Sequence, residues 1–169
     1  MQRQISDLLE YTSAGAEAVQ VENVDVAEAA QLVWQDHSTA LDGVDALLEV
    51  RSETFLRADP GLLHRLLLNL IGNSIKYRHP DRPLEVNIST RRDDEFDVLV
   101  VADNGLGFEQ KFARKIFAIF GRLHAKEAIP GTGLGLALSE RIVRLHGGSI
   151  SAKGDPGKGA VFEANFPRR

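Results

Sequence analysis

The stretch LLLNLIGNSIKY, residues 66–77, carries the pattern that decides the fold of this chain. Asn69 and Asn73 are four positions apart, so a helix places both carboxamides on one face, which Lys76 and Tyr77 continue. Carboxamide oxygens suit Mg²⁺, which usually takes phosphate oxygens as further ligands. Taken alone, however, the pair is better explained as two solvated side chains. Apolar residues at helical spacing supply the side that we expect to be buried: Leu63, Leu67, Leu70, Ile71 and Ile75.

The segments around this helix indicate the architecture. Asp59-Pro60 is typical of a helix start, and we expect the helix to continue to His79-Pro80. The other expected elements are helices within 25–42, 109–120 and 134–148, and strands over 18–24, as a pair within 46–59, over 84–90 and 95–103, and as a hairpin around 155–159. This order predicts an α+β fold, a two-layer sandwich with helices packed on one face of a mixed, mostly antiparallel sheet.

Composition excludes several classes of protein. With 169 residues, 43% hydrophobic and 26% charged, the chain suits one soluble domain. The net charge of -4 argues against a nucleic-acid partner, and no apolar run approaches membrane-spanning length, so we expect no membrane contact. The absence of cysteine excludes disulfides, thiolate metal sites and cysteine nucleophiles. We therefore expect a soluble, cytoplasmic domain.

A second motif, DNGLGF at residues 103–108, follows a strand. It delivers Asp103 into a turn in which Gly105 and Gly107 permit close backbone approach. A carboxylate in that position can accept a hydrogen bond from an exocyclic amine such as that of adenine. Alone, the segment is equally typical of an ordinary Asp-Asn-Gly turn.

A third motif, GTGLGLAL at residues 131–138, leads into a helix, and such a glycine-rich helix start favours an anion. It does not match the dinucleotide fingerprint, because Leu136 occupies the sixth position. Nor is there a P-loop, because the Gly157-Lys158 pair is followed by Gly159. Alone, a flexible turn before an amphipathic helix explains the segment equally well.

In this order, and with IFAIFGRLH (116–124) and GKGAVF (157–162), the motifs resemble the catalytic ATP-binding domain of bacterial sensor histidine kinases, members of the Bergerat-fold ATPases. The segments IKYRHPDRP and FGRLHAKEAIPGTGLGLAL are most similar to kinases of the phytochrome-associated type. The resemblance implies that residues 16–169 form the catalytic domain. Residues 1–15 would be the end of the dimerisation and phosphoacceptor helix.

The resemblance also implies a role for each residue of the central helix and the following turn. Asn73 would coordinate the Mg²⁺ that bridges the triphosphate of ATP, and Asn69 would support that metal. Lys76 would contact phosphate, and Tyr77 would line the nucleotide pocket. Asp103 would receive the adenine amino group, with the backbone of Gly105 and Gly107 lying close to the base.

Further phosphate contacts are implied for two segments. Residues 117–131 would form a mobile lid in which Arg122 and Lys126 contact phosphate, and Phe117 and Phe120 are expected in the core. At the start of the last helix, the backbone would approach the phosphates at Gly131, Thr132, Gly133, Leu134 and Gly135.

The reaction expected from the resemblance is phosphoryl transfer rather than hydrolysis. Hydrolysing members of the superfamily have a water-activating glutamate at the position of Asn69, whose amide cannot take a proton. None of the five histidines lies in the family's phosphoacceptor context. We therefore expect the acceptor histidine on a separate helical domain of the parent kinase, with a response regulator as a further partner.

Two other functions remain compatible with the motifs. A serine kinase of the anti-sigma-factor type has the same fold and glycine motifs and would phosphorylate a partner protein. A non-catalytic module would bind nucleotide merely to dock a response regulator or a dimer partner.

Overall fold

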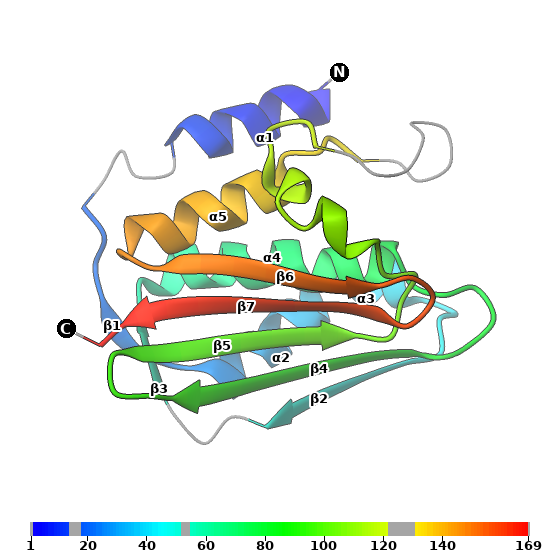
Figure 1. Ribbon diagram of the computed structural model, residues 1–169, viewed down its shortest axis with the longest axis horizontal. Coiled ribbons are helices and arrows are strands. Elements are labelled where there is room, and N and C mark those ends of the chain that lie inside the picture. Colours follow the sequence, from blue (N-terminus) through cyan, green and yellow to red (C-terminus); the bar gives the residue numbers. More distant parts are fainter. Residues whose placement is uncertain (1, 14–17, 52–54, 122–130, 169) are drawn as a thin grey trace.

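The computed structural model describes residues 2–13, 18–51, 55–121 and 131–168. Its helices are interspersed with single strands and pairs of strands along the chain (Figure 1). The elements in chain order are α1 (Gln2–Ser13), β1 (Glu22–Asp25), α2 (Val26–Asp36), α3 (Ser38–Leu41), β2 (Ala46–Arg51), β3 (Phe55–Ala58), α4 (Pro60–Lys76), β4 (Leu84–Arg92), β5 (Phe96–Asp103), η1 (Gln110–Phe112), η2 (Lys115–Phe117), α5 (Gly135–Leu145), β6 (Ser149–Asp155) and β7 (Gly159–Pro167).

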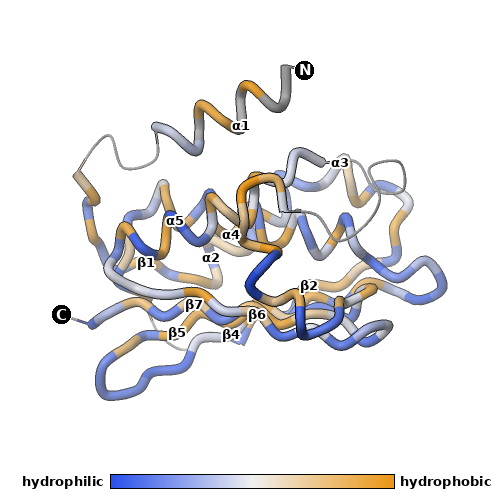
Figure 2. The backbone as a smooth tube through the Cα atoms, turned by 45° about the horizontal axis from the view of Figure 1, so that its top comes forward, coloured by the Kyte–Doolittle hydropathy of each residue, from blue (hydrophilic) through white to orange (hydrophobic). Residues whose placement is uncertain are grey.

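The main sheet has five strands in the order β2-β4-β5-β7-β6. Strand β2 is parallel to β4, and every other neighbouring pair in this sheet is antiparallel. Helices α2, α4 and α5 lie on one face of the sheet, and α1 lies over α5 on the side away from the sheet (Figure 2). The predicted two-layer α+β sandwich with a mixed, mostly antiparallel sheet is therefore confirmed.

The prediction that residues 46–59 form a strand pair is wrong in one respect. Both strands form, but β2 pairs with β4, whereas β3 pairs with β1 in a separate two-stranded sheet. The reason is that α4 lies between these strands in the chain and packs on the sheet. A connection through such a helix brings the next strand back in the same direction, so β4 runs parallel to β2. The first strand is also shorter than expected and covers only Glu22–Asp25.

Helix α4 begins where its sequence predicts. The side chain of Asp59 accepts a hydrogen bond from the backbone N–H of Leu62 at 3.0 Å, and Pro60 occupies the first turn. The helix ends at Lys76, three residues before the expected His79, and the carbonyl of the next residue, Tyr77, accepts the N–H of Leu106 at 2.8 Å. The end of α4 is thus joined directly to the turn that follows β5.

The expected helix within residues 109–120 is two single 3-10 turns, η1 and η2. Phe117 is buried and packs edge-on against Phe162, with 6.4 Å between ring centroids. Phe120 was expected in the core, but 59% of its surface is exposed. Its backbone is left-handed, with φ of 60°, and its N–H donates to the carbonyl of Gly133 at 3.0 Å, so the side chain points away from the core.

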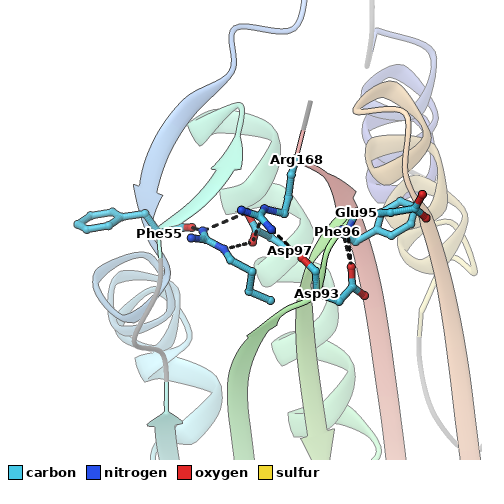
Figure 3. Close-up of polar contacts among 7 residues, drawn as sticks. Phe55, Asp93, Glu95, Phe96, Asp97 and Arg168 are labelled. Atoms are coloured by element: carbon cyan, nitrogen blue, oxygen red, sulfur yellow. Dashed lines mark hydrogen bonds and ion pairs between the residues drawn. The ribbon is translucent and has the colours of Figure 1, made fainter.

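A charged cluster holds the end of β5 that is remote from Asp103 (Figure 3). Asp97 is buried, and its carboxylate accepts hydrogen bonds from Arg92 Nε at 2.6 Å and Arg92 Nη2 at 3.4 Å. Arg168 Nε lies 4.0 Å from the same carboxylate, and Arg168 Nη1 donates to the carbonyl of Asp93 at 2.7 Å. Buried charged side chains in proteins are usually paired with side chains of opposite charge, as Asp97 is here.

Candidate functional site

Helix α4 is amphipathic in the predicted sense. Its predicted apolar residues are all buried: Leu63, Leu67, Leu70, Ile71 and Ile75. Asn69, Asn73 and Lys76 line a hollow on another side of the helix, and Lys76 Nζ lies 4.7 Å from the centre of the Tyr77 ring. The helical period therefore brings these four polar residues to one surface, as the sequence predicts.

Asp103, at the end of β5, is the acidic group of the site. Its Oδ2 accepts a hydrogen bond from Ser74 Oγ at 3.0 Å, and its Oδ1 accepts the N–H of Gly105 at 2.9 Å and of Ala160 at 3.3 Å. Burial raises the pKa of the Asp103 carboxyl above its ordinary value, and these three donors oppose the increase. Asp97, near the other end of the same strand, is instead paired with an arginine, Arg92.

Asp103 lines the first of two adjoining hollows, which is largely apolar. Tyr77 and Phe108 form part of its wall. The lining residues are Asn73, Tyr77, Asp103, Gly107, Phe108, Ile116, Gly121, Leu136, Ala160 and Phe162. A flat aromatic base with one exocyclic amine would place its rings against such walls and its amine at the carboxylate.

The second hollow adjoins the first and is called the polar hollow below, because two asparagines, a lysine and a threonine contribute to its lining. Both are lined by Asn73, Tyr77, Ile116, Gly121 and Leu136, so they form one continuous site. The second is completed by Asn69, Lys76, Gly131, Thr132, Gly133 and Gly135. Because α5 begins at Gly135, the positive end of its dipole faces this hollow, which suits an anion.

Two glycines are required by close backbone contacts. A Cβ on Gly107 would lie 2.1 Å from the carbonyl oxygen of Asp155, and φ is +63° there. A Cβ on Gly133 would lie 2.9 Å from the Cα of Phe120, with φ of +76°. Leu134, where the backbone is expected to approach the phosphates, has a buried side chain.

Two predicted phosphate contacts, Arg122 and Lys126, lie outside the described residues. Sequence reasoning missed Ser74, which follows Asn73 and lies on the Asp103 side of the helix. The available signal was a serine within a largely apolar helical stretch, and the structure buries it completely. It also missed Phe108 and Phe162, although both end quoted motifs.

The polar groups that line the second hollow suit a metal ion that arrives bound to phosphate better than one held by protein side chains alone. Asn69 Nδ2 is buried and has no hydrogen-bond partner among the described atoms, so its carboxamide keeps unused capacity beside the hollow. Within the described ranges, no three His, Asp or Glu side chains gather into a metal site. A cation bound here would take carboxamide oxygens from α4 and its other ligands from phosphate and water.

An apolar hollow with one buried carboxylate, opening into a hollow of carboxamides, a lysine and glycine backbone, is typical of an α+β domain that binds nucleotides. Comparison with known proteins specifies the class. The chain belongs to the family of histidine kinase-, DNA gyrase B- and HSP90-like ATPases, whose model matches residues 58–169.

The relatives are sensor histidine kinases and similar proteins. Phytochrome-like protein Cph1 of Synechocystis sp. is 33% identical over 167 residues, covering 99% of this chain and 22% of that protein. Sensor protein KdpD of Escherichia coli is 37% identical over 116 residues, covering 69% of this chain and 13% of that protein. The chain thus spans about a fifth or less of the length of these relatives.

Solved structures with the same fold include a sensor histidine kinase and a complex with AMPPNP. The mycobacterial sensor histidine kinase MprB is 26% identical with a TM-score of 0.74, covering 88% of this chain and 97% of that one. Full-length ShkA in complex with AMPPNP is 28% identical with a TM-score of 0.77, covering 98% of this chain and 35% of that one. Across the part of the chain that the structure describes, no helix combines the length and apolarity needed to cross a bilayer.

Proposed function

We propose that this chain binds ATP with Mg²⁺ and transfers the γ-phosphoryl group to a histidine on a separate helical domain of its parent kinase. The observation that carries the proposal is the continuity of the two hollows, one apolar with a buried carboxylate and the other lined by carboxamides, a lysine and glycines. Membership of the ATPase family and the names of the relatives support it. A response regulator would be the next acceptor.

The adenine would occupy the apolar hollow. Asp103, held by Ser74, Gly105 and Ala160, would accept the exocyclic amino group, and a neutral carboxyl would do so less well than a carboxylate. Gly107 would let the backbone lie close to the base.

The triphosphate would occupy the polar hollow. Asn73 and Asn69 would hold Mg²⁺ through their carboxamide oxygens, and Lys76 would contact phosphate directly. The backbone at the start of α5, from Gly131 to Gly135, would donate to phosphate oxygens. By resemblance, Arg122 and Lys126 would add charge. Bound Mg²⁺ neutralises the charge that develops on the transferred group.

The expected reaction follows from the side chain at position 69. A carboxylate at this position could accept a proton from water, but the Asn69 carboxamide cannot, so the site favours holding the γ-phosphoryl group. In the transfer, a bond forms between the γ-phosphorus and an imidazole nitrogen of the acceptor. The bond to the β–γ bridging oxygen breaks, and ADP leaves.

The test mixes the chain with the phosphoacceptor domain of its parent and γ-labelled ATP. We expect Mg²⁺-dependent, acid-labile phosphate on the acceptor domain, because phosphohistidine is acid-labile. Acid-stable phosphate on a partner would instead favour a serine kinase, and nucleotide binding with no transfer to any acceptor would favour a docking module.

Two variants control this experiment. Asn73→Ala removes the central metal ligand and should abolish Mg²⁺-dependent nucleotide binding. Asn87→Ala removes an exposed asparagine of β4 outside the two hollows and should leave binding unchanged. Equal binding by both variants would contradict the assigned metal site.

A further inference from the structure

The loop that joins α4 to β4 contains an arginine that the proposed function does not use. Arg82 Nε donates to the carbonyl of Asn104 at 3.0 Å, and Arg82 Nη2 donates to the carbonyls of Gly105 at 3.3 Å and Gly157 at 2.6 Å. Asn104 and Gly105 belong to the turn after β5, and Gly157 belongs to the turn between β6 and β7. One guanidinium therefore joins two turns that are about fifty residues apart in sequence.

These two turns meet backbone against backbone. A Cβ on Gly159 would lie 1.8 Å from the carbonyl oxygen of Asp103, and one on Gly107 would lie 2.1 Å from that of Asp155. Where glycines pack in this way, side chains cannot interlock, so hydrogen bonds must fix the contact. Besides the Arg82 bonds, the N–H of Gly157 donates to the carbonyl of Leu106 at 2.7 Å.

One of these turns and the strand that follows the other supply the backbone donors of the buried carboxylate: Gly105 lies in the turn after β5, and Ala160 is the second residue of β7, opposite Asp103 in the sheet. Gly105 N–H and Ala160 N–H both reach Asp103 Oδ1, one from each side of the contact that Arg82 spans. A change in the spacing of the two turns would therefore change both hydrogen bonds and the direction in which the carboxylate points. Arg82 itself does not line either hollow.

We propose that Arg82 is a positioning residue for base recognition: it clamps the two turns together and thereby sets the orientation of Asp103. This inference rests on the proposed function, because it assumes that an adenine nucleotide occupies the first hollow. The planar guanidinium is suited to the role because its N–H groups diverge and can reach several carbonyls at once, whereas an ammonium group is a compact point charge.

The first experiment measures amide hydrogen exchange without nucleotide, so it does not depend on the proposed function. In Arg82→Ala, the N–H groups of Leu106 and Gly157 should exchange about tenfold faster, while those in the middle of α4 keep their rates. Arg82 is exposed, and solvent competes with its hydrogen bonds, so we expect a local change rather than global unfolding. Unchanged exchange at both amides would overturn the proposal.

The second experiment measures dissociation constants for ATP and for inosine triphosphate, which has a carbonyl in place of the amino group. Arg82→Ala should reduce the preference for ATP about tenfold, since a hydrogen bond to a charged group is being misaligned. Arg82→Lys retains the charge and should lose most of the same preference. Arg91→Ala, which removes an exposed arginine paired with Glu163 on the sheet, should behave as wild type.

Each outcome decides a separate question. If Arg82→Lys behaves as wild type, charge rather than the clamp is responsible, and the proposal fails. If Arg82→Ala does not fold, the exchange and selectivity of Arg82→Lys decide in its place. If the wild-type chain binds no ATP, the proposed function fails, and the exchange measurement still shows whether Arg82 holds the turns.

Discussion

Replacing Asp103 by asparagine tests the central electrostatic feature of the site. Oδ1 of Asp103 accepts two backbone N–H groups, so in Asp103→Asn the amide oxygen must occupy that position. The amide nitrogen then lies where Oδ2 was, beside Ser74 Oγ. Ser74 can accept from it, because its own hydroxyl proton can turn to the carbonyl of Leu70, 3.2 Å away. The substitution is therefore accommodated without an unsatisfied polar group.

The consequence for binding follows from this orientation. Oδ2 has one protein donor, so it is the oxygen with capacity left for a ligand, and in Asp103→Asn that position becomes a donor. A hydrogen bond to a charged group is worth about 1.5–3 kcal/mol, so ATP affinity should fall roughly 10- to 150-fold. Inosine triphosphate offers a carbonyl to the new amide and should lose less. Calorimetric titration of both nucleotides measures the difference.

The consequence for stability has the opposite sign. Because burial raises the pKa of folded Asp103, its folded form binds the proton more tightly than the unfolded chain does. This contribution to the free energy of unfolding is complete at acid pH and is lost as pH rises through the folded pKa. The carboxamide of the variant does not titrate. Asp103→Asn should therefore gain stability relative to wild type between acid and neutral pH, and the gain should then level off.

Asp97, at the other end of the same strand, is the matched control (Figure 3). Its carboxylate is held by Arg92, so Asp97→Asn should destabilise the fold at neutral pH, since it removes the partner of that cation. Urea unfolding of both variants across the pH range provides the comparison. A stability difference between Asp103→Asn and wild type that does not change with pH would refute the reasoning.

Three further substitutions test other parts of the structure. Asp59→Ala should lower the free energy of unfolding, measured in urea, by about 1 kcal/mol at pH 7. Partial burial raises the pKa of the Asp59 carboxyl, but backbone N–H donors lower it overall, so the loss should shrink as pH falls through that lowered pKa. A loss that does not change with pH would contradict this. Asn69→Leu removes a buried amide nitrogen that has no hydrogen-bond partner, so the free energy of unfolding should rise by about 1 kcal/mol, while Mg²⁺-nucleotide binding should weaken. A lower free energy of unfolding would count against this prediction. Gly157→Ala should cost about 1–2 kcal/mol of the free energy of unfolding because φ is positive there. Gly159→Ala should cost more, because its φ is also positive and its Cβ would in addition clash with the carbonyl oxygen of Asp103; equal losses would disprove this.

Features set by local chemistry could be predicted from the sequence. The face shared by Asn69 and Asn73 follows from the helical period, and the start of α4 follows from an Asp-Pro pair that acts within one turn. The position of Asp103 at the end of a buried strand followed from the apolar run before it. In each case the interacting groups lie within a few residues of one another.

Features that join distant segments could not be predicted in this way. The hydrogen bonds that orient Asp103 come from Ser74 and Ala160, which are 29 and 57 positions away. Pairing of β2 with β4 depends on where α4 packs, and the exposure of Phe120 depends on a backbone bond to Gly133. No local pattern contains these distances, so the partners of Asp103, of β2 and of Phe120 could not be predicted from the sequence alone.

The composition of the polar hollow bears on how it would hold a triphosphate. Among its described lining residues, Lys76 is the one charged side chain. Asn69 and Asn73 are uncharged, so one lysine faces the several negative charges of a triphosphate, and a bound cation would supply the missing positive charge. Nucleotide affinity should therefore depend strongly on the metal at this end and on Asp103 at the other. With carboxamides in place of a carboxylate, the same residues that would hold the metal cannot activate water, which favours keeping the phosphoryl group for an acceptor.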